Sequence, residues 1–307
     1  MEFLKFLEKI RLPFFDKFFS LITNIGGEIV FMVLAITVFW CFSKKYGYYI
    51  LSVGFFGTVI NQFLKLAFRI PRPWVKDPDF TIVESARADA TGYSFPSGHT
   101  QNSVGTFGSI AYVTDKKWLR YVSIALIVLV PFSRMYLGVH TPLDVCVSFV
   151  IAALLVFAVR PLIEKGDKNP KLMYMIFCAM FVLSAALVMY TELFPFPADT
   201  DVENLASGIK NAYTLLGVTA GILIAFPIEK KCINFDVSGK WYVQIIKTVV
   251  GLLLLLGIRT VLKAPLNFIF GGHAVSNSVR YAVMIIFAVD VWPLTFNLIK
   301  KFFNKEV

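Results

Sequence analysis

The chain has 307 residues, of which 57% are hydrophobic and only 16% are charged, and its formal net charge is +10. A soluble domain carries about 25% charged residues, so this composition excludes an ordinary soluble enzyme. The excess of Lys and Arg does not indicate a nucleic-acid-binding protein, because these residues cluster in short segments between long apolar runs, where membrane topology explains them.

Runs of roughly 20 apolar residues recur along the chain, a length that spans the hydrocarbon core of a bilayer. Backbone polar groups in that core must be satisfied internally, so only helices or a closed barrel can cross it. The runs are continuous rather than alternating, which predicts an all-α, polytopic membrane helix bundle. The cysteines have no metal-binding spacing and predict no disulfide framework, so they are interpreted as packing residues: Cys41, Cys146, Cys178 and Cys232.

Residues 1–24 are predicted to form an amphipathic helix that lies along the membrane surface. Apolar side chains recur on one helical face, and Pro13 interrupts the pattern before a phenylalanine-rich stretch. Glu2 and Glu8 occupy the region that is basic in a secretory signal peptide, so a cleavable signal is not expected.

Eight membrane helices follow, and a ninth apolar stretch near 277–298 is expected to span as well. The eight are predicted near 26–43, 46–66, 97–114, 118–137, 142–160, 172–191, 209–227 and 242–262. Gly, Pro or charged residues separate them.

The segments between these spans alternate in charge, which predicts their orientation. Segment 192–208 contains acidic residues and no Lys or Arg, so it is expected outside, together with segments 67–96 and 138–141. The basic set is expected to be cytoplasmic, and with it the C-terminus: Lys44 and Lys45; Lys116, Lys117 and Arg120; Lys165, Lys168 and Lys171; Lys230 and Lys231; Lys300, Lys301 and Lys305.

The first segment with candidate chemistry runs from Lys65 to Pro73 and includes Arg72. Lys65 and Arg72 are seven positions apart, so two helical turns would place both cations on one face. Alternatively, both cations reach lipid headgroups at the end of a membrane helix.

The second segment is Tyr93-Ser94-Phe95-Pro96-Ser97-Gly98-His99-Thr100, directly before an apolar run. Pro96 suits the first position of a helix. Ser97 and Gly98 would then present backbone N–H groups without intrahelical partners, an arrangement that binds phosphate. The alternative is an ordinary helix cap with an incidental histidine.

The third segment contains Ser133, Arg134, His140, Thr141, Pro142 and Asp144. Thr141 is predicted to cap a helix that begins at Pro142, with Asp144 in its first turn. Asp144 can then accept a proton from one nitrogen of His140 and leave the other free to attack. Alternatively, Asp144 only caps the helix.

Together these segments contain what phosphoryl transfer requires: cations around the phosphate oxygens, a nucleophile and a proton donor. Lys65, Arg72 and Arg134 supply positive charge, joined by Ser97 and the Gly98 N–H. His140 can attack phosphorus. His99 can protonate the leaving alkoxide and then activate water. No metal and no other cofactor is expected.

At this point the chain resembles the type 2 phosphatidic acid phosphatase family. The resemblance is carried by Lys65-x6-Arg72-Pro73, Pro96-Ser97-Gly98-His99 and Ser133-Arg134-x5-His140-x3-Asp144, and it covers roughly residues 14–160. It implies the same roles: Lys65, Arg72, Ser97, Gly98 and Arg134 as phosphate ligands, His99 as acid and base, His140 as nucleophile and Asp144 as its orienting partner. It also implies a metal-independent mechanism.

The resemblance suggests a phosphatase core at 25–191 with a C-terminal transmembrane extension at 192–307. Between the first two motifs, residues 74–89 form a long segment interpreted as a lid or as a disordered loop. In the extension, ionisable residues in apolar surroundings are functional suspects: Arg259, Arg280 and Asp290, with His273 in an outer loop. No pairing is predicted among them, and His273 is expected to be structural or to face headgroups.

The predicted function is hydrolysis of a lipid phosphate or diphosphate, such as undecaprenyl pyrophosphate, phosphatidylglycerophosphate, phosphatidic acid or a sphingoid phosphate. Two alternatives remain: a phosphotransferase that uses the same site, and a non-catalytic protein that binds or transports anionic lipids. The expected partners are the substrate and membrane lipids, and the extension could support oligomers. Short loops favour a bacterial cytoplasmic membrane with the site on the extracytoplasmic face.

Overall fold

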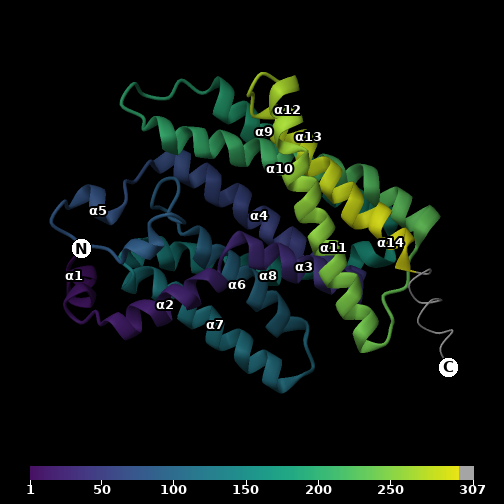
Figure 1. The fold of residues 1–307 in the computed structure, drawn as a ribbon, viewed down its shortest axis with the longest axis horizontal. Helices are drawn as coiled ribbons and strands as arrows, with labels where there is room; N and C mark the ends of the chain where they lie inside the picture. The colour runs from purple at the N-terminus through teal and green to yellow at the C-terminus, as the bar shows by residue number, and fades with distance from the viewer. Residues whose placement is uncertain (297–307) are drawn as a thin grey trace. The chain divides into compact units, whose positions relative to one another are not determined.

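The computed structural model describes residues 1–296, and within them every regular element is helical (Figure 1). The predicted all-α fold class is therefore confirmed. The helices of the first half are α1 (Glu2–Lys9), α2 (Pro13–Ile25), α3 (Glu28–Cys41), α4 (Lys44–Phe68), α5 (Pro73–Lys76), η1 (Glu84–Ala86), α6 (Gly98–Val113), α7 (Lys117–Tyr136) and α8 (Pro142–Lys168). Those of the second half are α9 (Pro170–Leu193), α10 (Val202–Ile228), η2 (Glu229–Ile233), α11 (Trp241–Val261), α12 (Lys263–Ile269), α13 (Val275–Ile286), η3 (Phe287–Val291) and α14 (Trp292–Leu294).

Within residues 1–296, seven helices are long and apolar enough to cross a membrane, or eight if the bent pair α2 and α3 forms one span. The sequence predicted eight or nine. The difference lies partly in α6, which has 16 residues and is too short to qualify alone. The predicted span 26–43 corresponds to α3, which meets α2 at a bend of 46°. A surface position for residues 1–24 stays a prediction.

Two compact units divide the described chain. The first contains Met1–Leu34, Tyr49–Pro161 and Pro195–Gly208. The second contains Ala35–Tyr48, Leu162–Phe194 and the chain from Ile209 onward. The chain-order boundaries predicted at residues 24 and 191 remain predictions.

In the first unit, α7 packs against α6, α2 and α1, as Figure 1 shows. Leu12 and Pro13 separate α1 from α2, since Pro13 has the fixed φ suited to a first helical position. Next to these helices is a buried apolar cluster of Leu4, Phe80, Ile82, Ala86, Tyr136, Leu137 and Val139. This cluster joins α1 to the segments that lead into the second and third motifs.

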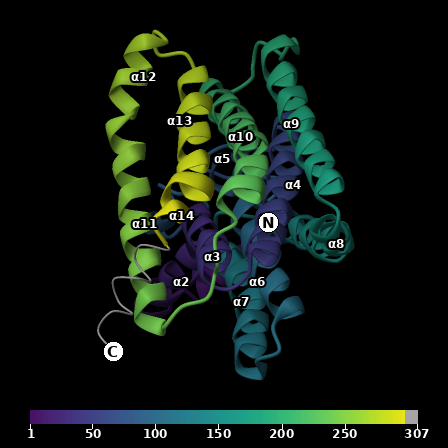
Figure 2. The same ribbon diagram turned by 90° about the vertical axis from the view of Figure 1, so that its right-hand side faces the viewer.

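In the second unit, α12 continues from the end of α11, and α13 runs back beside them (Figure 2). The indole of Trp40 donates to the Ala288 carbonyl at 2.7 Å, and that of Trp292 donates to the Lys247 carbonyl at 3.0 Å. Ser184 and Thr219 join α9 to α10 through their hydroxyls. The four cysteines are free thiols, consistent with the prediction that no disulfide forms.

Two expectations fall on residues outside the described part of the chain. They are the last residues of the ninth predicted span, 297–298, and the C-terminal basic cluster Lys300, Lys301 and Lys305.

Candidate active site

The three motif segments converge within the first unit. Their charged side chains are almost fully buried: Lys65 is 7% exposed, Arg72 6%, Arg134 0%, His140 1% and Asp144 1%. Both His99 and His140 lie within electrostatic range of the same three cations. Both histidines therefore lie near the same cluster of three cations.

The first motif reaches the site by a route that the sequence did not predict. Helix α4 ends at Phe68, Arg69 adopts a left-handed φ of 47°, and the chain then extends to Arg72. The prediction that Lys65 and Arg72 lie two turns apart on one face of a helix was therefore wrong. Pro71 explains the break, because its ring would clash with the carbonyl of the preceding turn and disfavours helix at the residue before it.

The Arg72 guanidinium is held by main-chain carbonyls on several sides. Its Nε donates to Gly92 O at 3.0 Å, Nη2 to Thr91 O at 2.7 Å, and Nη1 to Val139 O at 3.0 Å. Lys65 donates in the same way to Tyr93 O. The carbonyls of residues 91–93 thus offset the charge of both cations.

Arg72 also fixes the tautomer of His140. Its Nη1 lies 2.9 Å from His140 Nε2, and a guanidinium can only donate, so Nε2 accepts and carries the lone pair. The proton of a neutral imidazole is then on Nδ1, which faces Asp144 Oδ2 at 3.6 Å. That separation exceeds a hydrogen bond, as is common for catalytic pairs without substrate.

Burial, and then the neighbouring Arg72 guanidinium, lower the pKa of His140 well below its usual value. Both causes disfavour an imidazolium. His140 is therefore neutral near neutral pH, which is the form of a nucleophile.

Asp144 caps α8 and lies beside His140 at the same time. Its Oδ2 accepts from Thr141 N at 2.7 Å, and its own N–H donates to Thr141 Oγ1 at 3.3 Å. The helix begins at Pro142, as the sequence predicted. Capping and the His140 contact are therefore not alternatives, because the cap fixes the carboxylate that faces the imidazole.

Ser94 is a second holder of Asp144 that sequence reasoning did not identify. Its hydroxyl donates to Asp144 Oδ2 at 2.6 Å, and its N–H donates to Ile70 O at 2.8 Å. It is fully buried. Ser94 therefore joins Ile70, within the first motif, to the carboxylate of the third.

The second motif differs from its prediction by one residue. Helix α6 begins at Gly98 with Ser97 as its N-cap, so Pro96 precedes the helix instead of opening it. The Ser97 N–H is not available to a phosphate, because it donates to Asp144 O at 3.2 Å. The Ser97 hydroxyl accepts from Thr100 N and Thr100 Oγ1, which leaves its own proton to donate.

Open space lies beside Gly98. A Cβ at this position would meet no atom within 4 Å, in contrast to most glycines of the first unit. Gly98 and His99 are the first two residues of α6, where N–H groups have no partner in a preceding turn. The start of α6 can therefore receive a phosphate oxygen at close range.

Arg134 has more unpaired donors than Arg72. Its Nη1 donates to Thr23 Oγ1 at 2.6 Å, while Nε and Nη2 are buried without a hydrogen-bond partner among the described residues. An unpaired buried donor of a charged group is costly. A bound phosphate would satisfy both donors in the bidentate geometry that guanidinium groups favour.

Thr23 belongs to α2 and is 111 positions from Arg134 in the chain. It is 2% exposed. No local pattern marks a single threonine in an apolar helix, so this contact could not be predicted from the sequence.

The segment between the first two motifs is ordered and attached to α1. Lys5 forms an ion pair of 2.7 Å with Asp77, Glu8 accepts from Thr81 N at 2.8 Å, and Arg11 donates to Thr81 O at 2.8 Å. Phe80 and Ile82 are buried in the cluster that contains Leu4. Of the two interpretations, a disordered loop is therefore excluded within this structure.

Gly138 shapes the approach to His140. Its φ is +82°, a conformation that side-chain-bearing residues rarely adopt. A Cβ here would lie 2.6 Å from Arg11 Nη2 and 3.0 Å from the Phe80 ring. The turn between α7 and His140 therefore requires glycine for both conformation and space.

The ionisable suspects of the extension lie in the second unit and do not pair with one another. Arg280 donates to Asn277 Oδ1, whereas the Asp290 carboxylate is buried and has no hydrogen-bond partner in the described chain. His273 Nδ1 accepts from Val275 N at 3.2 Å, close to the start of α13. This contact fits the structural role expected for His273.

Within residues 1–296, no group of three or more His, Cys, Asp or Glu side chains could hold a metal ion. The motif site instead gathers three cations around two histidines, a donor set that repels a metal ion and attracts an anion.

Comparison of the sequence with known proteins identifies its family. The profile of the PAP2 superfamily matches residues 44–168, and that of the PAP2 superfamily phosphatase transmembrane extension matches residues 213–303. Phosphatidylglycerophosphatase B of Bacillus subtilis is 30% identical over 171 residues, which cover 51% of this chain and 79% of that protein. The chain belongs to the PAP2 superfamily.

Other relatives of this PAP2 protein are also phosphatases by name. Undecaprenyl-diphosphatase BcrC of Bacillus subtilis is 34% identical over 133 residues, or 42% of this chain and 66% of that protein. Sphingosine-1-phosphate phosphatase 1 of mouse is 24% identical over 266 residues, or 80% of this chain and 59% of that protein. No solved structure matches. The family and its transmembrane extension identify an integral membrane phosphoric ester hydrolase.

We expect Gly98→Ala to lower kcat/KM for phosphate release by about 10²-fold, since roughly 1 Å of misplacement can have this effect on a bound substrate. The fold should not suffer, because a helical Gly→Ala change is favourable by roughly 0.5–1 kcal/mol. Kinetics and thermal unfolding of the purified variant test this. Gly257→Ala in α11 is the matched control, since a Cβ there also meets nothing within 4 Å. Full activity of Gly98→Ala would show that no ligand approaches the start of α6.

We expect Thr23→Val to lower kcat/KM about 10- to 100-fold, because a hydrogen bond to a charged group contributes about 1.5–3 kcal/mol. Thr23→Ser keeps the hydroxyl and should keep most of the activity. Thr58→Val is the control, since the Thr58 hydroxyl only donates to Gly54 O within α4. Equal kinetics of the Val and Ser variants at position 23 would show that Thr23 does not position Arg134.

Proposed function

We propose that this protein is a metal-independent lipid phosphatase that works through a phosphohistidine on His140. The observation that carries the proposal is the cation cage, the buried cluster of Lys65, Arg72 and Arg134, which lies near both histidines. Two nitrogen donors of Arg134 in this cage have no hydrogen-bond partner among the described residues. Three positive charges and the start of α6 suit the dispersed negative charge of a phosphoryl group in its transition state.

Substrate binding is proposed to release the nucleophile. In the structure the lone pair of His140 Nε2 accepts from Arg72 Nη1 and is not free to attack. A phosphate oxygen is a stronger acceptor for a guanidinium than a neutral imidazole is. The incoming phosphate therefore takes this donor, and Nε2 becomes free only when phosphorus is within reach.

Nε2 of His140 then attacks phosphorus, and the P–O bond to the lipid breaks as the P–N bond forms. The leaving oxygen takes a proton from the imidazolium form of His99, which the negative charge of the bound phosphate favours by offsetting the three cations. Asp144 stabilises the charge that develops on the His140 ring. In the second half, His99 removes a proton from water, whose oxygen attacks phosphorus. The P–N bond breaks, phosphate leaves, and both histidines return to their starting forms.

The substrate is proposed to be a lipid whose chains remain in the membrane while its headgroup enters the site. The motif residues stand at the ends of membrane helices, where lipid phosphates lie. Undecaprenyl-diphosphatase, phosphatidylglycerophosphatase and sphingosine-1-phosphate phosphatase act on such molecules by name. The charge of the loops supports an extracytoplasmic site in a bacterial cytoplasmic membrane.

The test is phosphate release by purified protein in detergent with EDTA present, with lipid phosphates and diphosphates compared against soluble esters. We expect lipid substrates to be preferred and His140→Ala or His99→Ala to abolish turnover. Arg134→Ala should lower the rate by about 10²–10³, as for a lost donor to a developing oxyanion.

Three outcomes would contradict the proposal: full activity of His140→Ala, loss of activity with EDTA that a divalent ion restores, or transfer of phosphate to an added acceptor in place of release. The first would favour a lipid-binding protein and the last a phosphotransferase. Acid quenching followed by detection of phosphate on residue 140 tests the intermediate directly.

The lowered pKa of His140 predicts an unusual titration. Because the folded pKa lies well below 6.5, His140 should remain neutral at pH 6.5 and protonate only in more acidic solution. Arg72→Gln removes a nearby positive charge, so the pKa should rise and the acid limb of kcat/KM should move to higher pH. Nitrogen-15 NMR of labelled histidines can follow this, since the chain has only three, and His140→Ala assigns the signal. Half-protonation of wild-type His140 at or above pH 6.5 would refute the prediction.

A further inference from the structure

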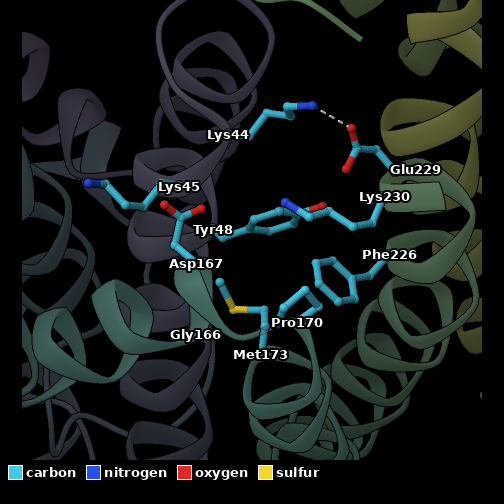
Figure 3. A pocket seen from close by; sticks show the side chains of 10 residues that line it. All are labelled: Lys44, Lys45, Tyr48, Gly166, Asp167, Pro170, Met173, Phe226, Glu229 and Lys230. Atoms are coloured by element: carbon cyan, nitrogen blue, oxygen red, sulfur yellow. Dashed lines mark hydrogen bonds and ion pairs between the residues drawn. The ribbon is translucent and has the colours of Figure 1, made fainter. Parts of the chain in front are cut away.

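A pocket in the second unit is separate from the motif residues (Figure 3). It contains about 380 Å³ of empty space, including its opening, and its lining includes Lys44, Lys45 and Lys230. Every lining residue belongs to the second unit, and none belongs to the three motifs.

The pocket is built from the ends of membrane helices. Lys44 and Lys45 open α4, Pro170 opens α9, and Phe226 lies near the end of α10. The N-terminal ends of α4 and α9 carry partial positive charge and unpaired N–H groups. These helices cross the membrane, so their ends lie at the level of lipid headgroups.

The pocket is lined by more lysines than are paired with carboxylates. Lys44 forms an ion pair of 2.7 Å with the buried Glu229 and donates to Asn234 Oδ1 at 3.1 Å. In the described chain no ion pair joins Asp167, the other lining carboxylate, to Lys45 or Lys230. Figure 3 shows the Lys230 side chain extending into the pocket over Tyr48. The Lys230 ammonium is thus available to an anion in the pocket. That of Lys45 lies at the rim, 4.6 Å from the centre of the Tyr46 ring, and points away from the pocket in Figure 3.

Tyr48 supplies an independent sign of a ligand. It is only 5% exposed, it lines the pocket, and its hydroxyl is buried without a hydrogen-bond partner among the described residues. Buried hydroxyls are nearly always paired. An acceptor in the pocket would receive this hydrogen bond.

We propose that this pocket is a second anion site, and that its ligand is the phosphate of an anionic membrane lipid. Lys230 pairs with the phosphate, and Lys45 adds positive charge from the rim, where its ammonium lies over the Tyr46 ring. The Tyr48 hydroxyl donates to one phosphate oxygen, and the helix starts add their partial charge. The apolar wall of Phe226, Met173 and Pro170 suits the glycerol and first methylenes of the lipid. Basic pockets between membrane helices bind such headgroups on the cytoplasmic side, where loop charge places these residues.

The test measures lipid binding to the full-length His140→Ala protein, in which bound lipid is not turned over. Native mass spectrometry in a neutral detergent compares dioleoyl phosphatidylglycerol with dioleoyl phosphatidylcholine. We expect the double variant Lys45→Gln, Lys230→Gln to weaken phosphatidylglycerol binding about 30-fold, since each lysine near an anionic lipid contributes about fivefold. Tyr48→Phe should weaken it about fivefold, as for one lost hydrogen bond.

The matched control is Lys168→Gln with Lys171→Gln, which removes the same charge from the adjoining α8–α9 turn without touching the pocket lining. It should leave binding unchanged, and thermal unfolding without lipid should show all variants folded. Competition by inorganic phosphate, lost in the pocket variants, would identify the phosphate group as sufficient. No competition would assign recognition to the whole headgroup. Equal weakening by pocket and control variants, or none in either, would overturn the proposal.

Discussion

The site depends on the burial of three cations around a single carboxylate. Lys65, Arg72 and Arg134 are each less than a tenth exposed, and isolated charges are not stable in such surroundings. Main-chain carbonyls and a hydroxyl offset part of this charge, while Asp144 is shared with the helix start and with Ser94. The excess positive charge that remains is the physical basis of affinity for a phosphate dianion.

This requirement explains why the N-terminal segment belongs to the phosphatase machinery. Helix α2 supplies the hydroxyl that holds Arg134, and α1 holds residues 77–82, which lead toward the second motif. Leu4 is fully buried in the same cluster as Leu137 and Val139, directly before His140. The amphipathic pattern of residues 1–24 thus has a second reading, because one face covers the site while phenylalanines remain exposed on the other.

The sequence predicted the chemistry of the site better than its backbone. Thr141, Pro142 and Asp144 are a local helix start, so spacing alone placed them correctly. Lys65 and Arg72 also have helical spacing, but α4 ends before the second turn because the ring of Pro71 would clash with the carbonyl of the preceding turn. Helical spacing in a sequence therefore predicts a shared helical face only where no proline interrupts the helix.

Contacts between distant segments were beyond sequence reasoning for another reason. Ser94 and Thr23 are common polar residues, and their importance comes from partners 50 and 111 positions away. In both cases the partner is a buried charged side chain, Asp144 or Arg134, which requires hydrogen bonds from other buried groups. A reader of sequence can infer that such a partner exists, but only the packing of helices decides which residue it is.

Arg72 and Arg134 differ in how many of their donors are already hydrogen-bonded. This difference suggests the order in which a phosphate would contact them. Arg72 already uses four of its five N–H groups before substrate arrives, one of them on the nucleophilic nitrogen, whereas the Nε and Nη2 atoms of Arg134 are unpaired among the described residues. A phosphate can therefore bind first to Arg134 without breaking any existing bond. Only its further entry competes for Arg72 and exposes His140. Under the proposed mechanism, water is a weaker acceptor for the guanidinium than a phosphate oxygen is, so water leaves the nucleophile covered, and binding and reaction are coupled through one hydrogen bond.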